Sequence, residues 1–302
     1  MDRLVAGMDV GGTKTQVMVL RGDLPLADVT VPTSTWRTWR LAGDARGLAD
    51  LLRSATPELP DCLAVGAHGC DSDAQCRELQ TALEQELECP VVVVNDSELL
   101  VPAAGYEAGI GVVSGTGSIA VARGRNGQML AAGGWGWILG DEGSAAAIVR
   151  EAAKAVRGAL DRGRSDDPLI AALLATLETN EATKLGRRLN EGRGAAEWGR
   201  HAGAVFMAAE NGSTLALKVV YDGAQALADL VKILSDRGAD AATVVAGGAV
   251  FAGQPLLFNA FRAAVLACSP ASEVVLLTKE PVLGAIAIAR RAIAGSQSQL
   301  AI

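Results

Sequence analysis

The chain has 302 residues, enough for one large or two medium domains, and with half of them hydrophobic and a fifth charged its composition is unlike that of a disordered protein. A net charge of −7 and an aromatic content of only 4% argue against a surface for nucleic acid or anionic membrane. The sequence has no run of eighteen apolar residues free of glycine and charge, and it does not begin with a signal-peptide pattern, so we expect a cytoplasmic protein.

The cysteine pattern favours reduced thiols. The number is odd and no Cys-x-x-Cys pair occurs, which is typical of thiols in a reducing compartment. A zinc site built from the first four is the alternative, although their spacing fits no common zinc motif. The five residues are Cys62, Cys70, Cys76, Cys89 and Cys268.

The N-terminal third predicts a β-meander followed by alternating helices and strands. Three strands are expected at 4–10, 15–20 and 26–31, joined by turns at 11–14 and 22–23. A helix at 48–54, a strand at 62–67, a helix at 76–88 and the strand 91–94 follow. His68, directly after the strand 62–67, is interpreted as structural.

The meander pattern returns about a hundred residues later. Strands are expected at 110–114, 118–122 and 128–132, with a glycine turn at 115–117 and a hairpin at 126–127. Two copies of one supersecondary unit predict two domains of related topology. The remaining elements predict an α/β fold with mixed sheets: helices at 144–161, 167–177, 195–209 and 213–237, strands at 243–246 and 274–277, and a closing helix from 282.

Three glycine turns each follow an apolar strand. Glycine lets backbone N–H groups come within hydrogen-bond distance of phosphate oxygens. An ordinary tight hairpin is the alternative for any one of them, but three in this order favour phosphate binding. The residues are Gly11 and Gly12 with Thr13 and Lys14, then Gly115, Thr116 and Gly117, then Gly247 and Gly248.

Two other phosphate motifs do not fit. A Walker A loop needs Gly-Lys before Ser or Thr, which residues 13–15 do not supply. Residues 115–120 match the glycine spacing of a dinucleotide fingerprint, but that motif must open a helix, and here a strand and hairpin are expected.

Three acidic residues are candidates for chemistry. Asp9, beside the first glycine turn, could hold Mg²⁺ against phosphates. Asp96, which follows the apolar strand 91–94, is either a helix cap or a general base for an attacking hydroxyl. Asp141, in a segment with Gly134 and Trp135, is either a helix cap or an acceptor for sugar hydroxyls, with the tryptophan packed on a sugar face.

These motifs together resemble the BadF/BadG-type ATPase family of the actin, hexokinase and Hsp70 superfold, and within it the N-acetylglucosamine kinases. The resemblance covers residues 9–287. It rests on the segments Asp9-Val10-Gly11-Gly12-Thr13-Lys14, Asn95-Asp96, Gly115-Thr116-Gly117-Ser118, Gly134-Trp135-Gly136, Gly140-Asp141-Glu142-Gly143-Ser144 and Val245-Ala246-Gly247-Gly248.

The resemblance implies two ribonuclease-H-like domains, 1–108 and 109–281, with an interdomain cleft and a closing helix, 282–302, that returns to the first domain. It implies ATP and Mg²⁺, with phosphates at the first two glycine turns, adenosine at the third and the metal at Asp9. Asp96 would be the catalytic base. Asp96, Ser118, Gly134, Trp135 and Asp141 would bind a small-molecule sugar, and pairing into a homodimer stays open.

The implied activity is phosphorylation of the 6-hydroxyl of an amino sugar, with N-acetylglucosamine ahead of glucosamine. One departure concerns the loop 33–40, where N-acetylglucosamine kinases commonly place an Asn and this chain has none. Thr35 or Arg37 would substitute, or the acceptor differs. An ATPase activator of a radical dehydratase is the alternative from another class, but no cysteine closely follows the segment 115–118 to hold an iron–sulfur cluster.

Overall fold

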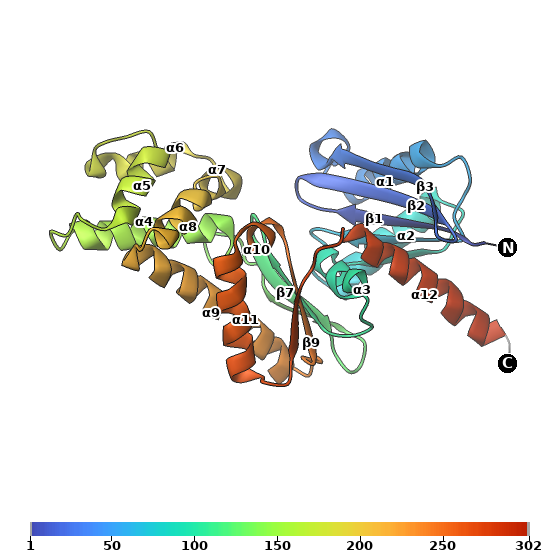
Figure 1. The fold of residues 1–302 in the computed structure, drawn as a ribbon. Coiled ribbons are helices and arrows are strands. Elements are labelled where there is room, and N and C mark those ends of the chain that lie inside the picture. Colours follow the sequence, from blue (N-terminus) through green and yellow to red (C-terminus); the bar gives the residue numbers. More distant parts are fainter. Residues whose placement is uncertain (1, 301–302) are drawn as a thin grey trace. The chain divides into compact units, whose positions relative to one another are not determined.

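The computed structural model describes residues 2–300, so the last two residues of the predicted closing helix, 301–302, lie outside it. Contacts group the chain into two compact units (Figure 1). The first takes in the chain up to Gly111, the segment Val121–Met129 and the chain from Leu277 onward. The second takes in Val112–Ala120 and Leu130–Leu276.

The first sheet has the strand order β3-β2-β1-β4-β5. The β1–β2 and β2–β3 pairs are antiparallel, whereas β1–β4 and β4–β5 are parallel. The carboxyl ends of β1, β4 and β5 therefore meet at one edge of the sheet. The strands are β1 (Leu4–Val10), β2 (Lys14–Arg21), β3 (Leu24–Pro32), β4 (Cys62–Ala67) and β5 (Val91–Val94).

Helices cover both faces of this sheet. Side chains alternate along β1, so that Met8 packs with α1 (Leu41–Ala55) and α2 (Asp73–Glu86), while Val5 packs with α12 (Val282–Leu300). The turn after β5 forms η2 (Asp96–Leu99) and α3 (Leu100–Ala104), and Leu99 joins the core beneath α12.

Two glycines let α12 approach the sheet closely. A Cβ on Gly7 of β1 would lie 3.0 Å from Ala285 Cβ and from the backbone nitrogen of Ile286. A Cβ on Gly284 would overlap the backbone carbonyl oxygen of Leu99. Helix α12 is thus seated directly on the turn that follows β5.

The second sheet has the order β10-β9-β6-β7-β8, which repeats the plan of the first. The prediction of one supersecondary unit used twice is confirmed. The strands are β6 (Ile110–Ser114), β7 (Ser118–Arg123), β8 (Met129–Gly133), β9 (Thr243–Gly247) and β10 (Glu273–Leu276).

The second unit carries most of the helices. The long α9 packs against α4, α8 and α11, and α5 packs against α8. They are α4 (Ala145–Leu160), α5 (Pro168–Thr176), α6 (Leu185–Glu191), α7 (Ala195–Gly199), α8 (Ala202–Glu210), α9 (Thr214–Asp236), α10 (Ala249–Gly253) and α11 (Pro255–Cys268), with 3₁₀ turns η1 (Thr33–Thr35) in the first unit and η3 (Ala182–Lys184) in the second.

Two helix predictions need correction. The predicted helix 195–209 is wrong as one element, because the chain breaks at Arg200 and His201 and forms α7 and α8. Helix α11 was not predicted at all, although Pro255 at its first turn and the apolar spacing of Leu257, Phe261 and Val265 mark it.

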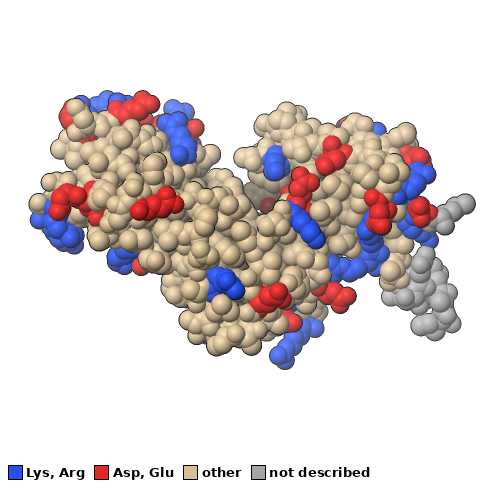
Figure 2. Space-filling view, viewed as in Figure 1, with Lys and Arg blue, Asp and Glu red and all other residues tan. Residues whose placement is uncertain are grey.

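Charged side chains of both signs are intermixed over the face shown in Figure 2, and blue and red groups alternate across both units. Across the described residues, we find no helix that combines the length and the apolar character needed to cross a bilayer.

Candidate active site

Three candidate site residues lie at the ends of three parallel strands of the first sheet. Asp9 lies near the end of β1, His68 directly after β4, and Asp96 just after β5. Because β4 lies between β1 and β5, the strand order places His68 between the two aspartates. Polar groups at the carboxyl ends of parallel strands form the usual ligand edge of an α/β sheet.

Asp9 is a partly buried carboxyl close to a second acid. Burial raises its pKa to about 7, with a further rise from Asp96 and an opposing effect of Lys14. A desolvated carboxyl beside another acid is a favourable place for a cation. Within residues 2–300 no three His, Cys, Asp or Glu side chains gather as metal ligands. The desolvated Asp9 carboxylate near Asp96 fits Mg²⁺ held otherwise by waters and phosphate oxygens, a usual arrangement for this ion.

The turn after β5 fixes the carboxyl group of Asp96. Asn95 is the residue that caps η2, and its side chain accepts a hydrogen bond from Ser97 N. Asp96 Oδ1 also accepts a bond from Ser97 N, at 3.1 Å. Asn95, and not Asp96, is thus the residue that caps the turn. The Asp96 side chain remains a quarter exposed.

Glu98 and Arg123 brace the same turn. Glu98 Oε1 accepts the Asn95 backbone N–H at 3.1 Å, which completes a capping box. Arg123 donates to both carboxylate oxygens of Glu98, at 2.8 Å through Nη2, and to Asp73 through Nη1. A two-pronged guanidinium contact of this kind holds geometry well.

His68 reaches from the β4 end toward Asp96. Its Nδ1 lies 3.7 Å from Asp96 Oδ2, an ion-pair distance, and the interaction with the Asp96 carboxylate raises the pKa of the imidazole. A Cβ on Gly12 would lie 3.6 Å from its Nε2, so the ring also borders the first glycine turn. The sequence interpretation of His68 as merely structural missed this position, because nothing local to residue 68 reveals the strand order.

The loop after β3 uses its polar side chains internally. Arg37 Nη2 donates to the His68 carbonyl at 2.7 Å, and its guanidinium stacks on the Trp39 ring at 4.3 Å. Thr35 Oγ1 donates to the Pro32 carbonyl at 2.7 Å. Thr35 therefore has a partner within the chain, whereas Arg37 supports the loop that carries His68 through Nη2 alone. Its Nε and Nη1 are buried without a hydrogen-bond partner.

In the second unit, the turn between β6 and β7 is a tight hairpin. Gly115 N donates to the Gly117 carbonyl at 2.9 Å, and β7 follows without a helix, as the argument against a dinucleotide fingerprint expects. A Cβ on Gly117 would lie 2.8 Å from Asp141 Oδ2. The hairpin and the Asp141 carboxyl are therefore in close contact.

Asp141 has an unusual environment. Its backbone is left-handed, with φ of 55°, and its Oδ1 is buried without a hydrogen-bond partner. Burial raises the pKa of its carboxyl group, against the effect of backbone hydrogen bonds from Ser118 and Gly136. The helix cap is Ser144 instead, whose side chain accepts from Ala147 N. Strain and an unpartnered oxygen together indicate a functional role.

The Trp135 loop is anchored at its ends and exposed at its tip. Arg150 donates to the carbonyls of Trp137 and Gly140, and Trp137 packs against Trp198 with ring centroids 4.8 Å apart. Trp135 itself is 77% exposed. Ser118, by contrast, is buried and donates its hydroxyl to the Glu142 carbonyl at 2.8 Å. Trp135 is free to contact a ligand, whereas Ser118 mainly holds the loop.

The third glycine turn follows β9. Gly247 ends the strand, and Gly248 has φ of 99°, a conformation that other residues rarely adopt. A Cβ on Gly248 would overlap the backbone carbonyl of Ser114. The turn therefore packs against the end of β6 within the same unit.

Gly115 offers a clean test of phosphate binding. Only Ala249 N, at 3.9 Å, would lie near its added Cβ, and its φ is not left-handed, so the protein itself tolerates alanine. We expect Gly115→Ala to raise the KM for ATP by about 10-fold or more, because a methyl group would displace the phosphate. The thermal midpoint should not change. Gly186→Ala, in open space on α6, is the control; an unchanged KM for ATP in Gly115→Ala would make the turn purely structural.

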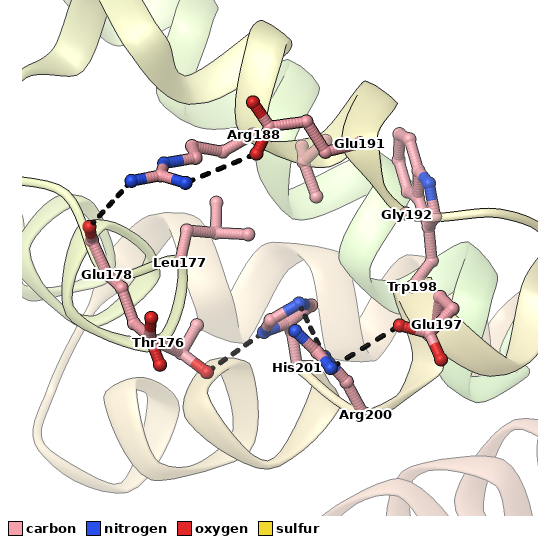
Figure 3. Close-up of a pocket in the computed structure, with 11 residues that line it drawn as sticks. Thr176, Leu177, Glu178, Arg188, Glu191, Gly192, Glu197, Trp198, Arg200 and His201 are labelled. Atoms are coloured by element: carbon pink, nitrogen blue, oxygen red, sulfur yellow. Dashed lines mark hydrogen bonds and ion pairs between the residues drawn. The ribbon is translucent and has the colours of Figure 1, made fainter.

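A separate small cavity lies among α5, α6, α7 and α8, with a volume of about 130 Å³ (Figure 3). Its charged groups pair with one another: Arg188 with Glu191, and Arg200 with Glu197. His201 contacts Thr176 Oγ1 at 3.0 Å. None of the predicted site residues lines this cavity. Its charged side chains pair with one another, so we interpret it as a packing gap between helices.

The fold and these motifs identify the chain's class. It belongs to the BadF/BadG/BcrA/BcrD ATPase family, whose model matches residues 6–289. Among curated proteins it is similar to an N-acetylmuramic acid/N-acetylglucosamine kinase of Clostridium acetobutylicum, at 27% identity over 95% of this chain and 98% of that protein.

Solved structures agree on the fold. A candidate N-acetylglucosamine kinase from Chromobacterium violaceum superposes with a TM-score of 0.68 at 25% identity, covering 94% of this chain and 98% of that one. A ROK-family glucokinase from Streptomyces griseus, solved with glucose and AMPPNP, has a TM-score of 0.59 at 19% identity and covers 95% and 99%. The two mixed sheets flanked by helices are thus those of actin-like sugar kinases.

Proposed function

We propose that this protein is an ATP-dependent kinase that phosphorylates the 6-hydroxyl of an amino sugar, with N-acetylglucosamine as the preferred acceptor. One observation carries the proposal. A partly exposed carboxyl, Asp96, is held by a capped turn at the end of β5, near the partly buried Asp9 that precedes the first glycine turn. Family membership and the similarity to amino-sugar kinases support the same chemistry.

Each residue has a role that follows from its environment. Asp96 accepts the proton of the sugar hydroxyl as that oxygen attacks the γ-phosphorus of ATP and the bond from this phosphorus to ADP breaks. Asp9 would hold Mg²⁺, which would supply positive charge to neutralise the phosphates. Main-chain groups of the glycine turns, with Thr13, Lys14 and Thr116, bind the phosphates, and Gly247 and Gly248 allow the adenosine to approach.

The acceptor preference rests on the residues of the second unit. An ionised carboxylate only accepts hydrogen bonds, so Asp141 suits sugar hydroxyls. Trp135, exposed beside Gly134, suits an apolar sugar face or an acetyl methyl group. Apart from Asp96 and Asp141, the predicted sugar-binding residues include no acid for the free ammonium of glucosamine, which favours the N-acetylated sugar.

A coupled assay of ATP consumption against hexoses, hexosamines and N-acetylhexosamines tests the proposal. We expect the highest kcat/KM with N-acetylglucosamine, because a site built for an acetamide leaves its polar groups unpaired with other sugars. A tenfold preference for glucosamine would contradict N-acetylglucosamine as the acceptor but would leave the proposed kinase activity standing. Absence of phosphorylation across the whole panel would overturn the kinase.

Asp141→Ala is expected to weaken sugar binding. Loss of a hydrogen bond to a charged acceptor costs about 1.5–3 kcal/mol, so the KM for the sugar should rise about 10- to 100-fold. The KM for ATP should change little. Glu142→Ala is the matched control, since the neighbouring Glu142 side chain is half exposed and lies 3.9 Å from Arg150. Equal sugar KM values in the two variants would remove Asp141 from the acceptor site.

A further inference from the structure

Asp96 has one oxygen held by its own turn and one directed at another strand. Oδ1 accepts from Ser97 N at 3.1 Å, while Oδ2 lies 3.7 Å from Nδ1 of His68. That second distance is an ion-pair distance, and contacts of this kind commonly shorten when substrate binds. A carboxylate held at both oxygens keeps its plane, and with it the direction of the lone pair that takes the proton.

The position of His68 is itself fixed. Its backbone N–H donates to the Val10 carbonyl at 2.8 Å, and its carbonyl accepts from Arg37 Nη2 at 2.7 Å. Arg37 is stacked on Trp39 and lies 3.6 Å from Asp44 Oδ2. The residue is therefore clamped between β1 and the loop after β3, and only its half-exposed imidazole can rotate.

We propose that His68 is a positioning residue for catalysis, which donates from Nδ1 to Asp96 Oδ2 and fixes that carboxylate for proton transfer. This inference rests on the proposed function of Asp96 as the base. It follows from the strand order, since β4 lies next to β5 and His68, directly after β4, lies 3.7 Å from Asp96 through its Nδ1. The raised pKa of the imidazole, caused first by its bond to Asp96, agrees with this contact.

Three substitutions at His68 test which of the two ring nitrogens is needed for activity. The side-chain amide nitrogen of Asn occupies the place of Nδ1, and that of Gln the place of Nε2. We expect His68→Ala and His68→Gln to lower kcat about 10- to 100-fold, as loss of catalytic alignment does, with the KM for ATP unchanged. His68→Asn should recover most of the wild-type kcat. His201→Asn, at the other histidine of the chain, is the control and should leave kcat unchanged.

A double-mutant cycle shows whether His68 acts through Asp96. If it does, His68→Ala should have no further effect on kcat in an Asp96→Asn background. Multiplied losses in the double variant would overturn the proposal, because His68 would then act on the phosphoryl group or elsewhere. Wild-type kcat in His68→Ala, or failure of Asn to rescue better than Gln, would also overturn it while leaving the base role of Asp96 intact. If Asp96→Asn itself keeps its kcat, the proposed function of Asp96 fails, and this inference fails with it.

Discussion

Asp96→Asn is expected to lower kcat by about 10²- to 10⁴-fold, the range that a general base contributes. The amide has nearly the shape of the carboxylate, so Oδ1 can still accept from Ser97 N and the turn capped by Asn95 should keep its fold. What is lost is the group that takes the proton. The KM for ATP should therefore change little, and steady-state kinetics with saturating sugar and ATP measure the effect.

The control for this variant is Asp222→Asn, on the exposed surface of α9, where the carboxylate pairs with Lys218. It should keep wild-type kinetics. If Asp96→Asn retains more than about a third of the wild-type kcat, a base contributing the expected factor cannot be at this position. A fall in the thermal midpoint comparable to a folding defect would instead indicate a structural role.

Among glycine-to-alanine substitutions in the first unit, we expect Gly284→Ala to lower the stability of the fold the most. The added Cβ would overlap the backbone carbonyl of Leu99, which cannot rotate away as a side chain could. Relief requires α12 to move off the sheet or η2 to shift. Overpacking of this kind costs about 1–3 kcal/mol and more where backbone is struck, so we expect about 3 kcal/mol of lost stability by chemical denaturation.

The same helix supplies the control. Gly295 lies farther along α12 and its added Cβ would meet no atom within 4 Å. Gly295→Ala should be neutral or stabilising by up to about 1 kcal/mol, because alanine is the better helix former. Because Leu99 ends the turn that begins at Asp96, Gly284→Ala should also lower kcat. Stability and kcat equal to those of Gly295→Ala would show that α12 does not press on this turn.

Strands and turns of this fold were accessible from the sequence because each is marked locally. Apolar runs such as 62–67 and 91–94 end at glycine or polar residues, and β4 and β5 have the predicted bounds. The repeated meander gave the two related sheets. Helix α11 was missed although Pro255 and its apolar spacing mark it, whereas the break between α7 and α8 falls at Arg200 and His201, where no proline or glycine cluster announces it.

The candidate site likewise has a part that the sequence predicts and a part that depends on the fold. Asp9, Asp96 and Asp141 could be predicted because each follows a strand or opens a glycine-rich segment. The partners that orient them could not. His68 meets Asp96 only because β4 is inserted between β1 and β5, and Arg123 meets Glu98 across 25 residues of sequence. Sequence shows which residue types are available, whereas strand order decides which of them meet.

The seating of α12 on β1 has a consequence for biosynthesis. The apolar face formed by Val5 and Ala64 is covered by Val282, Ala285 and Ile286, which the ribosome adds near the end of the chain. At a translation rate of about 5–20 residues per second, roughly 15 to 60 seconds separate the synthesis of Val5 from that of the α12 residues that cover it. Throughout that interval this face of the nascent first sheet lacks the apolar side chains that cover it in the folded protein. Completion of this unit therefore occurs after translation of the whole second unit, and premature termination before α12 should release an aggregation-prone product.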